Sequence, residues 1–172
     1  AVLLASGARY RRLNVPGEEA LLGVNIHFCA TCDGAFYKNS RLLVIGGGNS
    51  GFEEGLYLTR YAREVDIVEF APEVKASQIL QDEVAQPPNM VVITNHAVTG
   101  FQGGRKLETI LATDRATGET KAWHYDGVFV FIGLTPNSQL VAGQVPTDAT
   151  GFVLTDQTLM TPWPGLFAAG DV

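Results

Sequence analysis

Cysteine is scarce in this sequence, and its scarcity limits the metal chemistry that the chain can support. The 172 residues include two cysteines and three histidines. A structural zinc site takes four ligands, usually two cysteine pairs or cysteines joined by histidines. His27 stands too close to the cysteines to complete a tetrahedron easily, and His96 and His124 fall on expected strands. We therefore expect no metal site.

Long apolar runs and an excess of basic residues are also missing. No stretch approaches the roughly 18 apolar residues of a membrane span, and no basic-then-apolar signal peptide opens the chain. The net charge is −6, whereas nucleic-acid binders usually present a basic face. With 46% hydrophobic and 17% charged residues, the composition is that of a globular protein with a real core. We expect a cytoplasmic protein with no membrane and no nucleic-acid partner.

An initiator methionine is missing too, and both ends of the chain look like strands from inside a larger fold. "AVLLASGA" (1–8) begins as an apolar strand with no lead-in, and "GLFAAGDV" (165–172) ends as a buried strand does before its loop. The backbone groups of buried strands need neighbours. We expect a piece of a longer protein, holding one domain and parts of another.

The first half of the chain alternates expected strands and helices. Apolar runs predict strands at 41–47, 65–70 and 90–98. Between them, helical spacing predicts helices at 50–63 and 75–86, the second stopped by a pair of prolines. This alternation predicts an α/β fold with a Rossmann-like, doubly wound parallel sheet.

The pattern changes after Val98. Alternating apolar and polar residues, punctuated by glycine turns, predict an antiparallel meander of about three strands. A buried strand is expected at 127–133, followed by loop from 134 to 150 and one more short strand at 151–155.

A glycine-rich turn, "GGGNSG" (46–51), follows the strand expected at 41–47 and opens the next helix. It fits G-x-G-x-x-G through Gly46, Gly48 and Gly51. In that context the glycines allow a tight turn, backbone approach to a pyrophosphate and close packing of helix on strand. Glu69 lies near the expected end of the next strand, where a carboxylate accepts a ribose hydroxyl. We favour dinucleotide binding over a plain strand-to-helix turn.

The two cysteines lie together in "FCATCDG" (28–34). A disulfide between Cys29 and Cys32 closes a loop of a few residues, which restricts the unfolded chain little, so a purely structural role is unattractive. C-x-x-C beside a βαβ pattern is the redox spacing. Asp33, directly behind the pair, is either a proton shuttle for a redox reaction or a turn residue ahead of Gly34.

"CATCDGAFYKN", a strand and then "GGGNSGFEEGLYL" together resemble thioredoxin reductase of the low-molecular-weight type. Nearly the whole chain takes part: "LNVPGE" (13–18) resembles the linker of that family, "GVFVFIGLTPN" (127–137) its last nucleotide-domain strand, and "GLFAAGDV" the start of its closing flavin motif. The resemblance implies a redox dithiol.

The resemblance also implies roles for single residues. Cys32 would take electrons from a flavin, Cys29 would attack the disulfide of a partner protein, and Asp33 would shuttle the proton. Residues 46–51 would hold a nicotinamide dinucleotide, and Asp171 would contact FAD. The cofactor residues expected in this way are Gly46, Gly48, Asn49, Ser50, Gly51, Glu69, Gly133, Gly170 and Asp171.

The same resemblance implies the organisation and the partners. We expect the tail of a first FAD-domain segment and a linker at 1–24, a nucleotide-binding domain with the C-x-x-C at 25–138, and the start of a second FAD-domain segment at 139–172. Since only one G-x-G-x-x-G occurs, the N-terminal flavin half is expected to be absent and the isolated chain to be inactive. The full-length protein would bind FAD, reduce thioredoxin or a thioredoxin-like protein, and form a homodimer.

One departure from the family concerns the electron donor. Members that bind NADPH place a histidine and two arginines after the second strand, where this chain has Glu69, Phe70 and Ala71. A carboxylate repels a 2′-phosphate but accepts a free ribose hydroxyl, so NADH is expected rather than NADPH. Lys75 is the one nearby cation. One alternative is a reductase with another electron donor, such as ferredoxin. The other is a module that binds a dinucleotide without catalysis.

A second departure from the family is that glycine replaces the usual alanine at Gly51 and Gly55.

Overall fold

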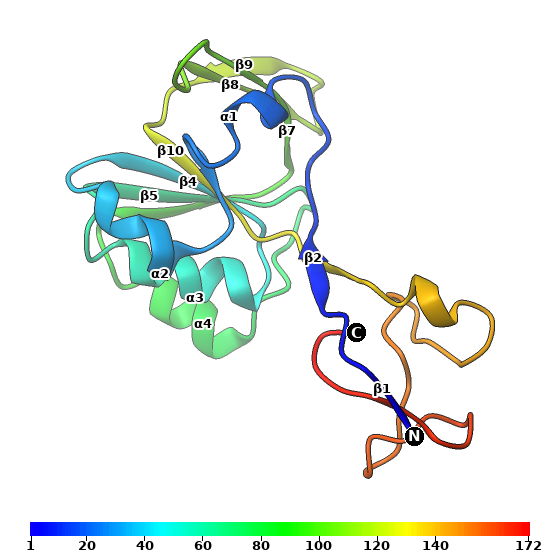
Figure 1. The fold of residues 1–172 in the computed structure, drawn as a ribbon. Helices are drawn as coiled ribbons and strands as arrows, with labels where there is room; N and C mark the ends of the chain where they lie inside the picture. Colours follow the sequence, from blue (N-terminus) through cyan, green and yellow to red (C-terminus); the bar gives the residue numbers. More distant parts are fainter. The chain divides into compact units, whose positions relative to one another are not determined.

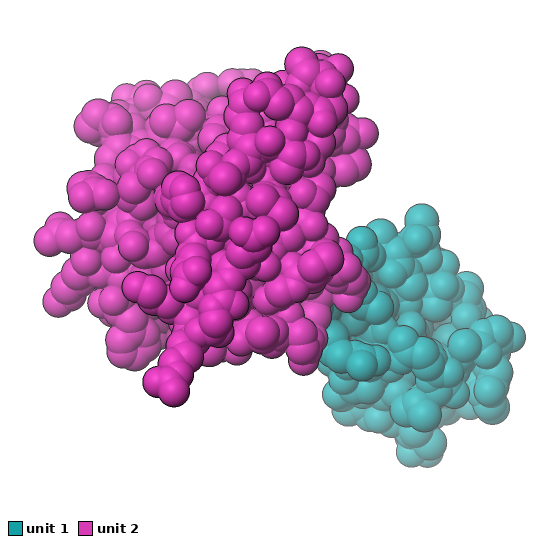
Figure 2. Space-filling model, turned by 90° about the horizontal axis from the view of Figure 1, so that it is seen from above, with its two compact units in different colours: residues 1–11, 133–172 teal, residues 12–132 magenta.

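A computed structural model describes residues 1–172, and the chain forms two compact units. The larger, unit 2, comprises residues 12–132, and the smaller, unit 1, comprises residues 1–11 and 133–172 (Figure 2).

Unit 2 is built on a five-stranded sheet in which every neighbouring pair is parallel. The strand order is β3-β10-β4-β5-β6. Helix α3 connects β4 to β5 and helix α4 connects β5 to β6, as the expected alternation requires. The bounds are β3 Ile26–His27, β4 Arg41–Ile45, α3 Asn49–Leu58, β5 Glu64–Val68, α4 Gln78–Val84, β6 Met90–Ile93 and β10 Gly127–Val130.

Both faces of this sheet are covered, each by a different kind of element (Figure 1). Leu42 and Val44 point into a core with α2 (Ala30–Asp33), α3 and α4, while Leu43 and Ile45 point into a second core on the opposite face. That second core includes residues from α1 (Glu18–Leu21) and from the meander. The predicted α/β fold with a parallel sheet and a meander is confirmed, and the meander takes the face that helices cover in a fully doubly wound sheet.

The single strand predicted at 90–98 is wrong: the chain forms two strands there. β6 ends at Ile93, and β7 begins at His96 and belongs to the antiparallel sheet β7-β8-β9. Between them Asn95 has φ 58°, a left-handed conformation that asparagine tolerates better than most residues. The bounds of the meander are β7 His96–Gln102, β8 Thr109–Asp114 and β9 Thr120–Trp123.

Gly55 has a packing explanation that the sequence did not provide. A Cβ at this position of α3 would lie 2.8 Å from the Cε of Met90 and 3.2 Å from the Cδ1 of Ile67. The helix therefore lies closer to β5 and β6 than a larger residue allows without rearrangement, which offsets the helix propensity lost with glycine.

Unit 1 contains two small two-stranded sheets. β1 (Val2–Leu4) pairs in parallel with β12 (Leu166–Ala168), and β2 (Ala8–Tyr10) pairs antiparallel with β11 (Leu134–Pro136). The chain ends form the predicted strands, and Val2 of β1 is 64% exposed in this chain, with β12 as the only strand beside it.

The rest of unit 1 differs from the sequence prediction in two places. The loop predicted at 134–150 contains β11 and a 3₁₀ turn at Gln139–Val141. The strand predicted at 151–155 is wrong, since Val153 makes only an isolated bridge to Thr147. Residues 152–154 share single backbone hydrogen bonds with Pro146, Asp148 and Val172, but these do not continue into a ladder.

None of the helices in the structure combines the length and the apolar character that a bilayer crossing requires.

The turn after β4 gives a stability prediction. Gly46 has φ +126°, and a Cβ there would lie 2.2 Å from the carbonyl oxygen of Phe131, whereas a Cβ on Gly48 would meet nothing within 4 Å. Gly46→Ala should lower the free energy of unfolding by at least about 2 kcal/mol, and Gly48→Ala by less than about 1 kcal/mol. Urea unfolding of the two variants checks this difference, and equal losses would contradict it.

Candidate functional site

The predicted functional residues of unit 2 gather at one edge of its sheet. Cys29, Gly46 and Glu69 follow the carboxyl ends of β3, β4 and β5. Parallel strands all end at the same edge, and ligands of open α/β sheets bind in the crevice outside it. The dithiol and the glycine-rich turn therefore share an edge, with only β10 between their strands.

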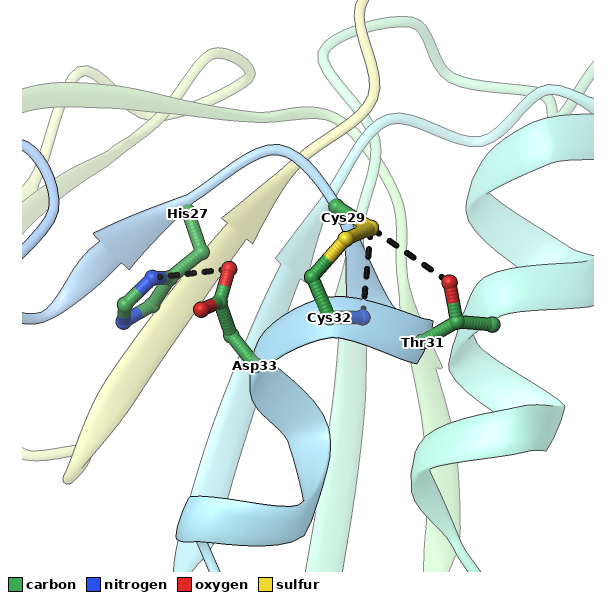
Figure 3. Close-up of a disulfide and its surroundings, with 5 residues drawn as sticks. All are labelled: His27, Cys29, Thr31, Cys32 and Asp33. Atoms are coloured by element: carbon green, nitrogen blue, oxygen red, sulfur yellow. Dashed lines mark hydrogen bonds and ion pairs between the residues drawn. A yellow bond between two sulfur atoms is a disulfide. The ribbon is translucent and has the colours of Figure 1, made fainter.

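The two cysteines form a disulfide, with their Cα atoms 5.3 Å apart (Figure 3). Cys29 caps the short helix α2, and its sulfur accepts the backbone N–H of Cys32 at 3.2 Å. The hydroxyl of Thr31 lies 3.4 Å from the same sulfur. Cys29 is half-buried and Cys32 is exposed. A thiolate on Cys29 would have two donors close by, which favours the charged form of that sulfur.

Asp33 points its carboxyl group toward His27, the last residue of β3 (Figure 3). The Nδ1 of His27 lies 3.2 Å from the Oδ2 of Asp33, and its Nε2 lies 2.7 Å from the hydroxyl of Tyr37. The ring also packs on Phe129 of β10, with centroids 5.3 Å apart. Sequence reasoning missed His27 and Tyr37. The sequence offered one signal for His27: it is a polar residue in a short apolar segment, two places before Cys29.

Burial sets the charge of this histidine. Burial lowers the pKa of His27, and the Asp33 carboxylate offsets only part of that effect. Burial also raises the pKa of Tyr37, so its hydroxyl keeps its proton. At neutral pH the imidazole is therefore neutral and has one donor and one acceptor nitrogen.

The glycine-rich turn is tied to the end of β5. The carboxylate of Glu69 accepts the N–H of Gly47 at 2.6 Å through one oxygen and the N–H of Ala71 at 2.8 Å through the other. Gly51 lets α3 approach the turn, because a Cβ there would lie 1.9 Å from the carbonyl oxygen of Gly46. Helix α3 then begins without a side-chain cap. The turn thus presents open helix N–H groups beside a carboxylate, which suits a phosphate and a ribose.

The other predicted cofactor residues lie in different surroundings. Asn49 is tied to the protein, since its Oδ1 accepts the N–H of Ser77 at 2.8 Å, while Ser50 is exposed. Gly133, Gly170 and Asp171 belong to unit 1. The structure contains no group of three or more histidine, cysteine, aspartate or glutamate side chains that could hold a metal ion.

Arg115 is a cation at the tip of β5 that sequence reasoning missed. It comes from the β8–β9 turn, and its guanidinium lies 3.7 Å from the centre of the exposed ring of Phe70. One of its nitrogens donates to the carbonyl oxygen of Phe70 at 2.9 Å. Lys75, in contrast, is held through its backbone, whose N–H donates to Gly47. No local sequence signal connects Arg115 with Phe70, 45 residues away.

Comparison with known proteins covers the whole chain. The family model described as pyridine nucleotide-disulphide oxidoreductase matches residues 1–172. The chain belongs to the pyridine nucleotide-disulphide oxidoreductase family. This places the disulfide and the glycine-rich turn in a family whose name joins the two functions that they suggest.

Individual members of the family give the scale of the similarity. The chain is 42% identical to thioredoxin reductase of Listeria innocua, with 100% of the chain and 54% of that protein covered. It is 41% identical to a Bacillus subtilis protein named NADH dehydrogenase, with 99% of this chain and 33% of that protein covered. The crystal structure of Lactococcus lactis thioredoxin reductase superposes with a TM-score of 0.90 at 35% identity, with 99% and 57% covered. The chain thus spans about half the length of its thioredoxin reductase relatives.

The buried histidine gives a pH prediction. The unfolded chain binds a proton at His27 with a pKa of about 6.5, while the folded chain binds it only at lower pH. The contribution to the free energy of unfolding is therefore complete above about pH 6.5 and is lost as the pH falls toward the lowered folded value.

Urea unfolding between about pH 8 and about pH 5 measures this loss. His27→Gln, which cannot titrate, should show a shallower decline than the unchanged chain. Equal declines would contradict the assignment.

Proposed function

We propose that this chain is the central portion of a flavin-dependent disulfide reductase of the thioredoxin reductase type. One observation carries the proposal: the Cys29–Cys32 disulfide, with Asp33 behind it, lies at the same sheet edge as the glycine-rich turn and Glu69. The similarity to thioredoxin reductases along the whole chain supports it. Electrons would pass from a reduced nicotinamide through FAD to the disulfide and on to a thioredoxin-like protein.

The residues of the chain fit these roles unequally. The exposed Cys32 is available to a flavin, and Cys29 has the neighbouring donors that an attacking thiolate needs. The open start of α3 and the carboxylate of Glu69 fit the pyrophosphate and ribose of a dinucleotide. For FAD the chain offers the exposed Asp171. When bound, the flavin would accept a hydride and release electrons to the disulfide.

In agreement with the family resemblance, we assign the nucleotide-binding domain to residues 25–138, the tail of a first FAD-domain segment and a linker to 1–24, and the start of a second FAD-domain segment to 139–172. The compact unit 12–132 takes in the linker and ends before residue 138. The protein partner, a homodimer and a cytoplasmic location follow from that resemblance and stay predictions.

The longer protein tests the proposal directly. Its flavin should be bleached by a reduced nicotinamide, and the electrons should then reduce thioredoxin. Cys29→Ser should abolish thioredoxin reduction and leave flavin reduction intact, because the nicotinamide would reduce the flavin without Cys29. Stopped-flow absorbance with NADH, NADPH and reduced ferredoxin, compared side by side, identifies the donor. A longer protein that binds a dinucleotide but never bleaches a flavin would be a binding module instead.

The donor preference rests on Glu69. Both of its oxygens already accept a backbone N–H, and each keeps a further lone pair for a ribose hydroxyl. A 2′-phosphate at that place would meet only negative charge from this side chain. The guanidinium of Arg115 lies close by, but it is already stacked on Phe70 and bonded to a carbonyl. The name of the Bacillus subtilis relative is in line with NADH.

NADH should therefore bind this chain at least about tenfold more tightly than NADPH, because charge-assisted hydrogen bonds to the 2′-phosphate are missing. Replacing Glu69, Phe70 and Ala71 with histidine, arginine and arginine should reverse the order. Calorimetric titration measures both affinities.

Arg115→Ala is the matched control for this prediction. It should leave the ratio of the two affinities unchanged. A selective loss of NADPH affinity would assign the phosphate to Arg115, and tighter binding of NADPH by the unchanged chain would refute the preference. If neither NADH nor NADPH gives a binding signal, a donor such as ferredoxin is favoured.

A further inference from the structure

We propose that His27 is a positioning residue that holds the carboxyl group of Asp33 for proton transfer at the dithiol, with Tyr37 fixing the tautomer of the ring. The proposal rests on the reductase function proposed above, in which Asp33 shuttles the proton. It adds two residues, from β3 and from the turn after α2, to which the sequence assigns no chemistry.

The direction of each donor follows once Asp33 is taken as a carboxylate. An ionised Asp33 only accepts, so the Nδ1 of His27 donates to it across 3.2 Å. The neutral ring then has an unprotonated Nε2, and the hydroxyl of Tyr37 donates to it across 2.7 Å. The same hydroxyl also lies in donating geometry to the carbonyl oxygen of Val24, at 3.3 Å, and its single proton goes to the nearer Nε2. The chain of donors therefore runs from Tyr37 through His27 to Asp33.

The packing around the three side chains holds this series of hydrogen bonds in place. His27 is 8% exposed and is held by β3, while Phe129 packs on its ring and Tyr37 packs edge-on against both rings. Asp33 is half-buried on α2, next in sequence to Cys32. A carboxyl group held through a buried ring keeps one orientation, and a proton donor acts well only when its orientation is kept.

The charged groups around the ring are few. Asp33 is the one that acts on His27 itself, and Asp33 and Asp126 act on Tyr37. A pH effect that passes through His27 is therefore expected to depend on Asp33.

The step can be studied in this chain with a small dithiol. A dithiothreitol thiolate forms a bond to one protein sulfur, and the Cys29–Cys32 bond breaks with its electron pair on the other sulfur. The Asp33 carboxylate takes up a proton from solvent and passes it to that sulfur, which returns Asp33 to its ionised form. The second thiol of dithiothreitol then closes its own ring and releases the second cysteine. Dithiothreitol loses two electrons and two protons, and the protein gains both.

Two substitutions separate positioning from mere packing. Asparagine places an N–H near the Nδ1 of the histidine, so His27→Asn keeps a donor to Asp33. Glutamine reaches toward the Nε2, so His27→Gln keeps a partner for Tyr37 but loses the donor to Asp33. Reduction by dithiothreitol, corrected for its thiolate fraction, should slow about fivefold in His27→Gln and less than about twofold in His27→Asn.

A double-mutant cycle with Asp33→Asn decides the proposal. Asp33→Asn should slow reduction about tenfold or more and flatten its pH profile, and adding His27→Gln should then change nothing further. The exposed His124, changed to Gln, is the matched control and should react like the unchanged chain. If His27→Gln does not fold, Tyr37→Phe replaces it and should slow reduction about threefold only when Asp33 is present.

Equal slowing by His27→Gln with and without Asp33, or equal slowing by the asparagine and glutamine variants, would overturn the proposal. The measurement needs neither flavin nor nucleotide. If the longer protein failed to reduce thioredoxin, the dithiothreitol result would still test the role of His27. The reductase proposal and the His27 proposal can therefore fail separately.

Discussion

The parallel pairing of β4 with β10 on one side and β5 on the other is the constraint on which the rest of unit 2 depends. It makes the strands end at one edge, and it is fixed because side chains on both faces are buried in separate cores. A one-residue slip of β4 would exchange Leu42 and Val44 with Leu43 and Ile45 between those cores. The packing of the strands in these two cores therefore fixes where the loops at their carboxyl ends lie.

Glu69 has a structural role as well as a candidate role in recognition. Its carboxylate ties the glycine-rich turn to the end of β5 through the N–H groups of Gly47 and Ala71. The following loop adds two bonds, from Lys75 and Ala76 to the carbonyl oxygen of Gly47. Because the turn is already shaped by these bonds, little ordering is left for a bound dinucleotide to impose.

The disulfide has a different support. Helix α2 is only four residues long and could not hold its side chains in place by itself. It is attached to the sheet through the contact of Asp33 with His27, whose ring lies against β10. The exposed residue Cys32 thus lies on a short segment with a buried anchor, an arrangement that combines access with a fixed position.

Much of the fold was predictable because the signals are local. Apolar runs and helical spacing indicated β4, α3, β5, α4 and the meander, although the helices begin or end several residues from the predicted bounds. The glycine-rich turn and the C-x-x-C spacing indicated the candidate site without any coordinates. The break at Asn95 was not predictable in this way, since one apolar run feeds two different sheets.

The sequence by itself determined which chemical groups the protein has and roughly which strand each one follows. Only the tertiary structure decided which groups meet: His27 with Asp33 and Tyr37, and Arg115 with Phe70. The physical reason is that periodicity and turn chemistry depend on neighbouring residues, whereas contacts across a sheet depend on the register and packing of strands that are distant in sequence.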